Sequence, residues 1–184
     1  MARRVTGGGA VFHQTEITYS FVVPESHPLS RRSVLASYEN ICVGVIAGLK
    51  ELGIESSFAP INDIIASGKK ISGNAQTRKL GCILQHGTIL IDLDVDLMFS
   101  LLKVPAEKAK GRLIEDVKER VTSLRSLLAR DVSFSEASSA LQKGFAEALD
   151  LNYEGQSMLS ATEQLSAVAI AKNKFANADW TGRR

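Results

Sequence analysis

Three segments of the sequence place glycine beside cationic or polar side chains and could therefore hold an anionic ligand. In the first segment, 3–12, Arg3 and Arg4 precede the glycine run at 7–9. Glycine lets backbone N–H groups surround an anion, and arginine offers phosphate a bidentate, permanently charged partner. The segment is neither a Walker loop nor the GxGxxG turn of a dinucleotide fold. Taken alone, it is explained more simply as a structural hairpin turn.

The second segment, 61–75, carries Lys70 among small residues in a stretch with the composition of a strand. A lone lysine in a strand is usually a solvated edge residue. The neighbouring Asn62-Asp63 pair has an equally simple explanation, an Asx turn that satisfies its own backbone. This segment alone is weak evidence for a site.

The third segment is Gln85-His86-Gly87-Thr88, inside an apolar run. A histidine in this setting is more often a hydrogen-bonded core residue than a ligand or a base. The two cysteines, Cys42 and Cys82, lie far apart and belong to no CxxC or Cys/His cluster, so we expect buried free thiols in a reducing compartment.

The elements that must position these segments begin with strands. β-branched and aromatic residues dominate 10–12 and 16–23, which predicts a hairpin-like pair of strands. Helical spacing of apolar residues then predicts a long helix over 34–52, with Ser30 or Ser33 as its cap and Gly53 as its stop. Shorter extended pieces follow at 56–58, 63–65, 70–72 and 82–92.

Helices dominate the second half of the chain. A short helical turn is expected near 96–101, and capping boxes at Ser133 and Ser160 predict helices that run to 149 and to about 175. Strands first and helices later indicate an α+β fold with a mixed or antiparallel central sheet and flanking helices. We expect one domain over 1–184.

Composition excludes several classes of protein. The chain has 184 residues, 45% of them hydrophobic and 23% charged, and a formal net charge of +2. This balance argues against nucleic-acid partners and against a polybasic membrane anchor. No stretch reaches the roughly 18 apolar residues that a membrane span needs, so we expect a cytoplasmic protein without membrane contact.

Together, the three segments resemble the signature blocks of the lipoate-protein ligase A family, in the biotin/lipoate ligase superfamily. The resemblance rests on Arg3-Arg4-x-Thr-Gly-Gly-Gly-Ala-Val-Phe-His13, on Asn62-Asp63 followed by Gly68-Lys69-Lys70-Ile71-Ser72-Gly73-Asn74-Ala75, and on His86-Gly87-Thr88. Their order and spacing agree as well. The carboxyl end, with Lys174, Phe175 and Trp180, is similar to the end of the family's catalytic domains.

This resemblance implies a catalytic domain akin to class II synthetase and biotin-ligase cores. The family activates lipoate or octanoate with ATP and Mg2+ to an acyl-adenylate, then passes the acyl group to a lysine of a lipoyl acceptor domain. The acceptors would be 2-oxoacid dehydrogenase E2 subunits and the glycine cleavage H protein. The absence of a GRGRxGR-type loop argues against biotin as the substrate.

The resemblance also assigns roles to residues. It implies that Lys70 is catalytic, because a fixed ammonium between the acyl carboxylate and the α-phosphate stabilises the charge that develops there. Asp63, oriented by Asn62, would hold magnesium or a polar part of the ligand. Gly73 and Gly87 would let the acyl chain lie against bare backbone. The implied residues for binding ATP or lipoyl-adenylate are Arg4, Gly7, Gly8, Gly9, Ala10, Val11, Phe12, Lys70, Gly73, Asn74, His86, Gly87 and Thr88.

Two alternatives stay open. The first is an octanoyl- or lipoyl-transferase of the same superfamily, which uses a cysteine nucleophile and no ATP. In those relatives the cysteine lies shortly upstream of the lysine block, where this chain has Ser56-Ser57, and neither Cys42 nor Cys82 is well placed. The Asn62-Asp63 pair also resembles the ligases, so the ATP-dependent ligase is the favoured prediction.

The second alternative is a non-catalytic or truncated ligase subunit. Members of the family carry several tens of residues before the arginine-glycine block, which here starts at Arg3. Many ligases also have a small accessory domain after the core. The resemblance therefore implies an N-terminally short catalytic domain, whose accessory domain a separate polypeptide could supply.

Overall fold

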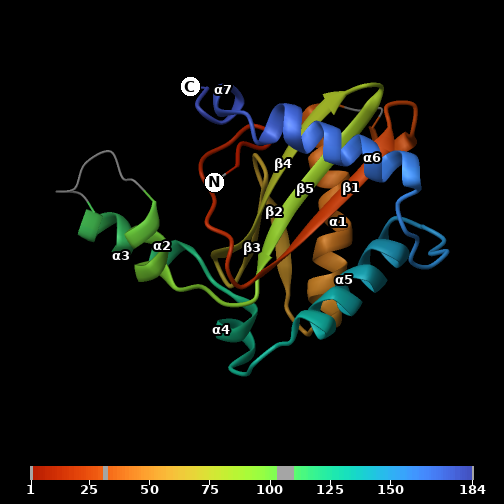
Figure 1. Ribbon diagram of the computed structural model, residues 1–184. Coiled ribbons are helices and arrows are strands. Elements are labelled where there is room, and N and C mark those ends of the chain that lie inside the picture. The colour runs from red at the N-terminus through yellow and green to blue at the C-terminus, as the bar shows by residue number, and fades with distance from the viewer. Residues whose placement is uncertain (1, 31–32, 103–109, 184) are drawn as a thin grey trace. The chain divides into compact units, whose positions relative to one another are not determined.

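The fold is built on a five-stranded, fully antiparallel sheet with flanking helices (Figure 1). The computed structural model describes residues 2–30, 33–102 and 110–183. The strand order is β1-β5-β4-β3-β2, and the sheet confirms the α+β prediction. The strands are β1 (Glu16–Pro24), β2 (Ser56–Ala59), β3 (Asp63–Ala66), β4 (Lys69–Lys79) and β5 (Cys82–Leu90).

The described chain forms two compact units. One unit contains the two ends of the chain, up to Gly7 and from Tyr153 onward, and the other is Gly8–Asn152. The larger unit contains the sheet and the helices η1 (Pro28–Ser30), α1 (Val34–Glu51), α2 (Val95–Leu101), α3 (Lys110–Arg120), α4 (Leu124–Leu128) and α5 (Phe134–Ala148). The unit of the chain ends contains α6 (Ala161–Ile170), the π-helical turn η3 (Ala171–Phe175) and α7 (Ala178–Thr181).

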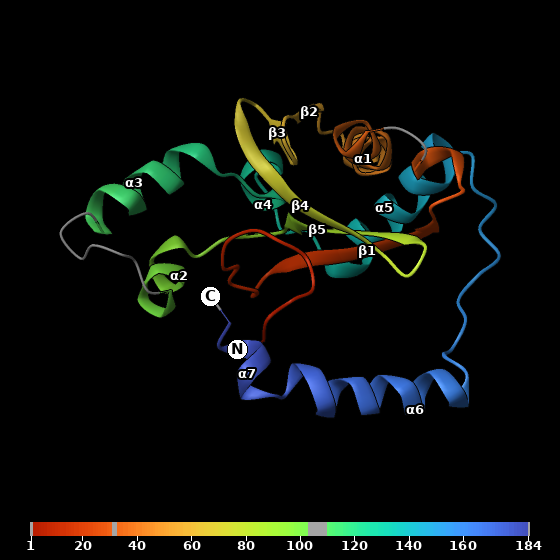
Figure 2. The same cartoon turned by 90° about the horizontal axis from the view of Figure 1, so that it is seen from above.

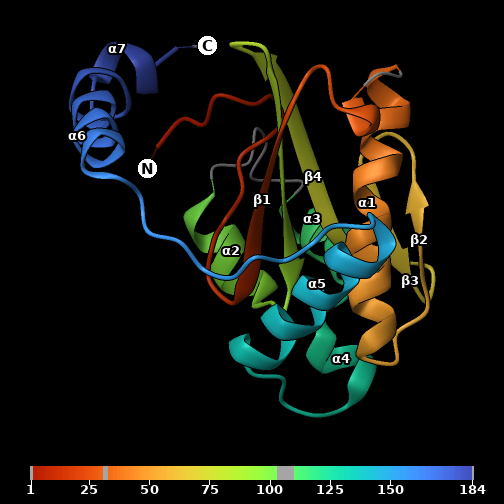
Figure 3. The same cartoon turned by 90° about the vertical axis from the view of Figure 1, so that its right-hand side faces the viewer.

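Helices α1 and α5 pack together on one face of the sheet (Figures 2 and 3). Helix α1 begins where predicted, because the Ser33 side chain accepts a hydrogen bond from the Ala36 N–H. The two helices approach closely at glycines. A Cβ on Gly48 would lie 2.7 Å from the Leu141 Cα, which is closer than carbon atoms can pack.

The core lies between these helices and the sheet. Along β5, buried residues alternate with partly exposed ones, so that every second side chain points toward α1 and α5. The fully buried side chains are mostly aliphatic and come from several elements: Ile41, Val45, Leu49, Ile64, Ile71, Ile83 and Leu124.

Three predicted elements differ from the observed ones. Residues 10–12 form no strand, and β1 pairs with β5 instead. Strand β4 extends well beyond the predicted 70–72, because its second half is polar yet fully paired with β5. Leu80 and Gly81 (φ 55° and 71°) connect the two strands as a tight turn. In the described part of the chain, no helix combines the length and apolar character needed to cross a membrane.

Candidate functional site

An ion pair between Lys70, near the start of β4, and Asp63, the first residue of β3, crosses the β3–β4 hairpin. The Lys70 Nζ is 2.6 Å from the Asp63 Oδ1, and the two side chains are 42% and 32% exposed. This Asp63 oxygen is itself buried and has no other partner. The ammonium is therefore held in place while its remaining surface is open to a ligand.

A register shift brings these two side chains to the same face. Asp63 is opposite Gly73, but past a shift between Ile64 and Ile65 the next pair is Ile65 with Lys70. Lys70 is three positions from Gly73 and would face the opposite side in a regular strand, but the bulge absorbs one residue and keeps Lys70 on the face of Asp63, although their neighbours Ile64 and Ile71 are buried. The bulge is thus what presents the lysine.

The space beside Gly73 and Gly87 is filled by side chains of the protein and not by the expected acyl chain. A Cβ on Gly73 would lie 3.0 Å from the Lys70 Cε and 3.1 Å from its Nζ, so this glycine leaves room for the lysine. A Cβ on Gly87 would overlap the Asn74 Oδ1 and lie 2.7 Å from the Tyr19 Cε1. The prediction that both glycines present bare backbone to the acyl chain is corrected accordingly: side chains of the protein fill the space that they leave.

Strand register sorts the remaining predicted residues of the sheet onto two faces. Thr88 pairs with Gly73, and Gly73 pairs with Asp63. These three residues therefore form a row across three strands, on the same face of the sheet as Lys70. His86, two residues from Thr88, lies on the same face. Asn74 pairs with Gly87, and this row lies on the opposite face, toward α1 and α5. The face of Lys70 is thus the one available to a substrate.

The arginine-glycine segment is divided between the two compact units. Arg4 belongs to the unit of the chain ends, where its Nε and Nη2 donate to the Gly7 carbonyl at 3.1 and 2.7 Å. Residues 8–12 belong to the unit of the sheet, and Val11 is 47% exposed. The binding roles expected for Arg4 and for Gly7, Gly8, Gly9, Ala10, Val11 and Phe12 stay predictions.

The residues around Asp63 do not fit a magnesium site. The described residues contain no cluster of three or more histidine, cysteine or acidic side chains that could hold a metal ion. The carboxylate of Asp63 contacts the ammonium of Lys70, which competes with a cation for the same oxygen.

Neither cysteine is close to Lys70. Cys42 on α1 is fully buried, and burial raises the pKa of its thiol to about 12 despite a hydrogen bond from Gln85. Cys82 pairs with Lys79 at the far end of β4. Lys79 is nine residue steps along the strand from Lys70, which corresponds to about 30 Å. The sequence-based prediction that neither thiol is well placed is confirmed.

A cavity of about 380 Å³, unforeseen from the sequence, lies next to the backbone of Lys70. The Thr122 N–H donates to the Lys70 carbonyl at 2.8 Å, and Thr122 and Ser123 both line the cavity. The other lining residues include the acidic run at 92–96 and Lys118. A Thr-Ser pair just before a short helix was the only signal in the sequence.

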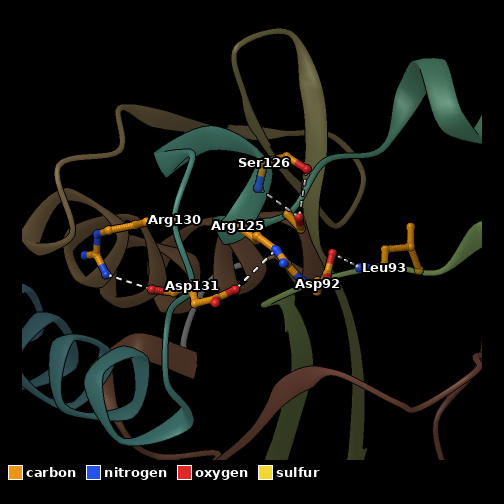
Figure 4. Close-up of polar contacts among 7 residues, drawn as sticks. Asp92, Leu93, Arg125, Ser126, Arg130 and Asp131 are labelled. Carbon is orange, nitrogen blue, oxygen red and sulfur yellow. Dashed lines mark hydrogen bonds and ion pairs between the residues drawn. The ribbon is translucent and has the colours of Figure 1, made fainter.

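Charged contacts fix the wall of this cavity (Figure 4). The Arg125 Nη1 donates to the Asp92 Oδ2 at 2.9 Å, and its Nε lies 3.3 Å from the Asp131 Oδ1. The contact between Arg125 and Asp92 joins α4 to the chain that follows β5. Helix α4 comes directly after Thr122 and Ser123, so this contact also connects the residues beside Lys70 to the sheet.

Comparison with known proteins places this site in a family. The model of the lipoyl protein ligase A/B catalytic domain matches residues 1–146. The chain is 35% identical to octanoyltransferase LipM of Brevibacillus brevis, over 99% of this chain and 74% of that protein. It is 36% identical to octanoyltransferase LipM of Geobacillus kaustophilus, over 99% and 73%.

Solved structures agree with the fold. A bipartite lipoate protein ligase from Thermoplasma acidophilum is similar with a TM-score of 0.88 and 28% identity, over 98% of this chain and 69% of that one. A lipoate-protein ligase A bound with ATP has a TM-score of 0.80 and 27% identity, over 98% and 70%. Biotin protein ligase from Aquifex aeolicus shares the fold, with a TM-score of 0.56 and 19% identity over 74% and 53%.

These relatives correct one prediction. The ATP-dependent ligase was favoured, but eight curated relatives, at 31–37% identity over the length of the chain, are octanoyltransferases. The ligase activity and its need for ATP and Mg2+ are therefore not supported, and the transferase alternative fits better. The chain belongs to the lipoyl protein ligase A/B catalytic domain family, in the biotin/lipoate A/B protein ligase superfamily.

Proposed function

We propose that this enzyme transfers an octanoyl-type acyl group from a carrier thioester to a lysine of a lipoyl acceptor domain, without ATP. The observation that carries the proposal is the likeness to octanoyltransferases over 99% of the chain. The Lys70–Asp63 pair on the open face of the sheet supplies a fixed positive charge of the kind that acyl transfer uses.

In this proposal the amine of the acceptor lysine attacks the thioester carbonyl. A C–N bond forms and the C–S bond breaks, while the proton lost by the amine ends on the departing thiolate. Negative charge develops on the carbonyl oxygen in the transition state. An ammonium held by Asp63 stabilises that charge without having to reorganise, which is the role we propose for Lys70.

The acceptor amine is proposed as the nucleophile because the chain places no thiol near Lys70. An acyl-enzyme on cysteine, as in the cysteine-dependent transferases, would need a reactive thiolate. Cys42 is buried with a raised pKa, and Cys82 lies at the other end of β4. Transfer in a complex of enzyme, acyl donor and acceptor needs neither cysteine.

Several finer assignments belong to the same proposal. The acceptors are lipoyl domains of 2-oxoacid dehydrogenase E2 subunits and the glycine cleavage H protein, and lipoate is a possible second acyl group. A cytoplasmic location, a separate accessory domain and one catalytic domain over 1–184 stay predictions.

The test is an acyl-transfer assay read by the mass of the acceptor. We expect the enzyme, an octanoyl carrier protein and a lipoyl domain to give an acceptor heavier by one octanoyl group, at the same rate with and without ATP. An acceptor in which arginine replaces the modified lysine should gain no mass. Transfer that needs ATP, or no transfer from the carrier, would contradict the proposal.

Lys70→Ala tests the site itself. We expect the rate of transfer to fall by about a hundredfold or more, because the charge facing the carbonyl oxygen is lost. Lys69→Ala is the matched control, since Lys69 is adjacent and exposed and its Nζ donates to the Lys118 carbonyl, at 3.5 Å, rather than to Asp63. Equal rates for the two variants, with circular dichroism showing both folded, would exclude the proposed role of Lys70.

A further inference from the structure

A line of buried and half-buried polar side chains crosses the sheet on the face opposite Lys70. The Gln76 Nε2 donates to the Gln85 Oε1 at 3.0 Å, and the Gln85 Nε2 donates to the Tyr19 hydroxyl at 2.9 Å. The Tyr19 hydroxyl donates to the Asn74 Oδ1 at 2.7 Å. The line therefore joins β4, β5 and β1 and returns to β4 at Asn74.

Each bond in this line orients the next group. A tyrosine hydroxyl has one proton, so accepting from Gln85 directs that proton toward Asn74. Because the Asn74 Oδ1 is then occupied, its Nδ2 must point the other way, where it donates to the Asn62 carbonyl at 2.9 Å. The position of the Asn74 amide is thus determined by groups in the core.

Three hydrogen bonds connect Asn74 and Asn62. Besides the side-chain bond, the Asn74 N–H donates to the Asn62 carbonyl at 2.9 Å, and the Asn62 Nδ2 donates to the Asn74 carbonyl. Asn62 immediately precedes Asp63, the partner of Lys70. These bonds fix the point at which the chain enters β3, and hence the place of the Asp63 carboxylate.

The surroundings make these bonds strong. Asn74 is 4% exposed and Gln85 is completely buried, so water does not compete with their partners. Burial raises the pKa of Tyr19 well above its usual value, which keeps its hydroxyl a neutral donor at any working pH. Gly87 contributes by leaving the space that Asn74 and Tyr19 fill.

We propose that Asn74 is a positioning residue: oriented by Tyr19, it holds Asn62 and thereby fixes the Lys70–Asp63 pair. The functional part of this inference rests on the proposed acyl transfer, whereas the positioning itself can be measured without it. Asn74 lies on the face away from the substrate and acts only through its neighbours.

Tyr19→Phe is the sharpest test, because it removes one hydroxyl and keeps the ring that packs on Phe145 at 5.2 Å between centroids. We expect kcat for acyl transfer to fall by about tenfold while KM for the acyl donor changes by less than about twofold, since only the placement of Lys70 is affected. Asn62→Ala, at a half-buried position, should act in the same direction.

A second readout needs no activity. Acetic anhydride acetylates lysine side chains that it can reach, so a Lys70 side chain held against Asp63 is expected to react slowly, whereas exposed Lys69 provides an internal reference. We expect Tyr19→Phe to raise the rate of Lys70 acetylation relative to Lys69 by about threefold or more, as the pair loosens. The rates are read by mass spectrometry of peptides.

Tyr38→Phe is the matched control. Tyr38 is also buried, at 8% exposure, but its hydroxyl contacts the backbone of Gln76 and not Asn74. We expect it to leave both readouts unchanged. If Tyr19→Phe gives the same acetylation ratio as Tyr38→Phe, the positioning role is wrong. If the ratio changes as expected but the wild type transfers no acyl group, the positioning role stands and the proposed function fails.

Discussion

The two cysteines illustrate how burial decides what a residue can do. Cys42 has the residue type of a nucleophile, yet it is completely buried on α1 and its pKa is raised to about 12. Desolvation disfavours the thiolate, and only the thiolate is reactive. Cys82, at the start of β5, is partly exposed.

This difference predicts selective alkylation. At about pH 8, iodoacetamide should modify Cys82 of the native protein and leave Cys42 unmodified, because the thiolate fraction of Cys42 rises only as the pH approaches about 12. In denaturant, both should react. The modified peptides are identified by mass spectrometry. Rapid modification of Cys42 in the native state would show that its environment differs from the one described.

The sequence predicted some of the site, and the rest depended on register. Lys70 and Asp63 could be named from their motif, but their mutual contact results from the shift in pairing after Ile64, which leaves no mark in the order of residues. The role of Gly87 was misassigned for a related reason. Its neighbours Tyr19 and Asn74 are distant in sequence and meet only across strands.

At the scale of elements, helix packing depends on positions without side chains. Helices α1 and α5 cross where Gly48 meets the backbone of Leu141. The crossing brings the backbones closer than any side chain would allow. We therefore expect the separation of these helices to be sensitive to a single methyl group.

Gly48→Ala should lower the free energy of unfolding by about 1–3 kcal/mol, because its Cβ must displace backbone rather than a flexible side chain. Gly111→Ala in α3 is the control, since a Cβ there meets nothing within 4 Å and alanine favours helix by up to about 1 kcal/mol. Urea denaturation measures the free energy of unfolding of both variants. If Gly48→Ala were as stable as Gly111→Ala, α1 and α5 would be able to move apart without a loss of stability.

Local signals predicted the helices better than the strands. Ser33, Ser133 and Ser160 each cap the helix that follows, because a cap depends on a few neighbouring residues. The second half of β4 was missed because its residues are polar, and composition does not show that they pair with β5 and with the polar network behind it. Residues 10–12 had strand composition but found no partner strand.

At the scale of the molecule, the two compact units differ in how much they bury. Helix α6 has no buried residue, and Leu165, Val168 and Ile170 on it are each more than half exposed. The unit that contains it is held by contacts such as the Trp180 Nε1 donating to the Arg3 carbonyl at 2.8 Å. The Lys174 Nζ lies 4.4 Å from the centroid of the Trp180 ring, as a cation–π contact. Segments with little apolar burial open at low free energy.

The single tryptophan makes this difference measurable, because Trp180 is in the unit of the chain ends. In urea, we expect the fluorescence of Trp180 to change at a lower concentration than the far-ultraviolet circular dichroism, which is dominated by the larger unit. Tyr19→Phe should leave the fluorescence midpoint unchanged. Coincident midpoints for the two signals would show that the units unfold as one.

The register shift between β3 and β4 also limits how this hairpin can change in length. Side chains alternate between the faces of a strand, so adding one residue to β3 between Ile64 and Ile65 would give Ile71 a partner and turn Lys70 from the open face toward the core. Residues added at the exposed tip, Ser67 and Gly68, would leave the pairing on either side intact. A tag or a spectroscopic label inserted at the tip is therefore compatible with the site, whereas a single residue inserted between Ile64 and Ile65 is not.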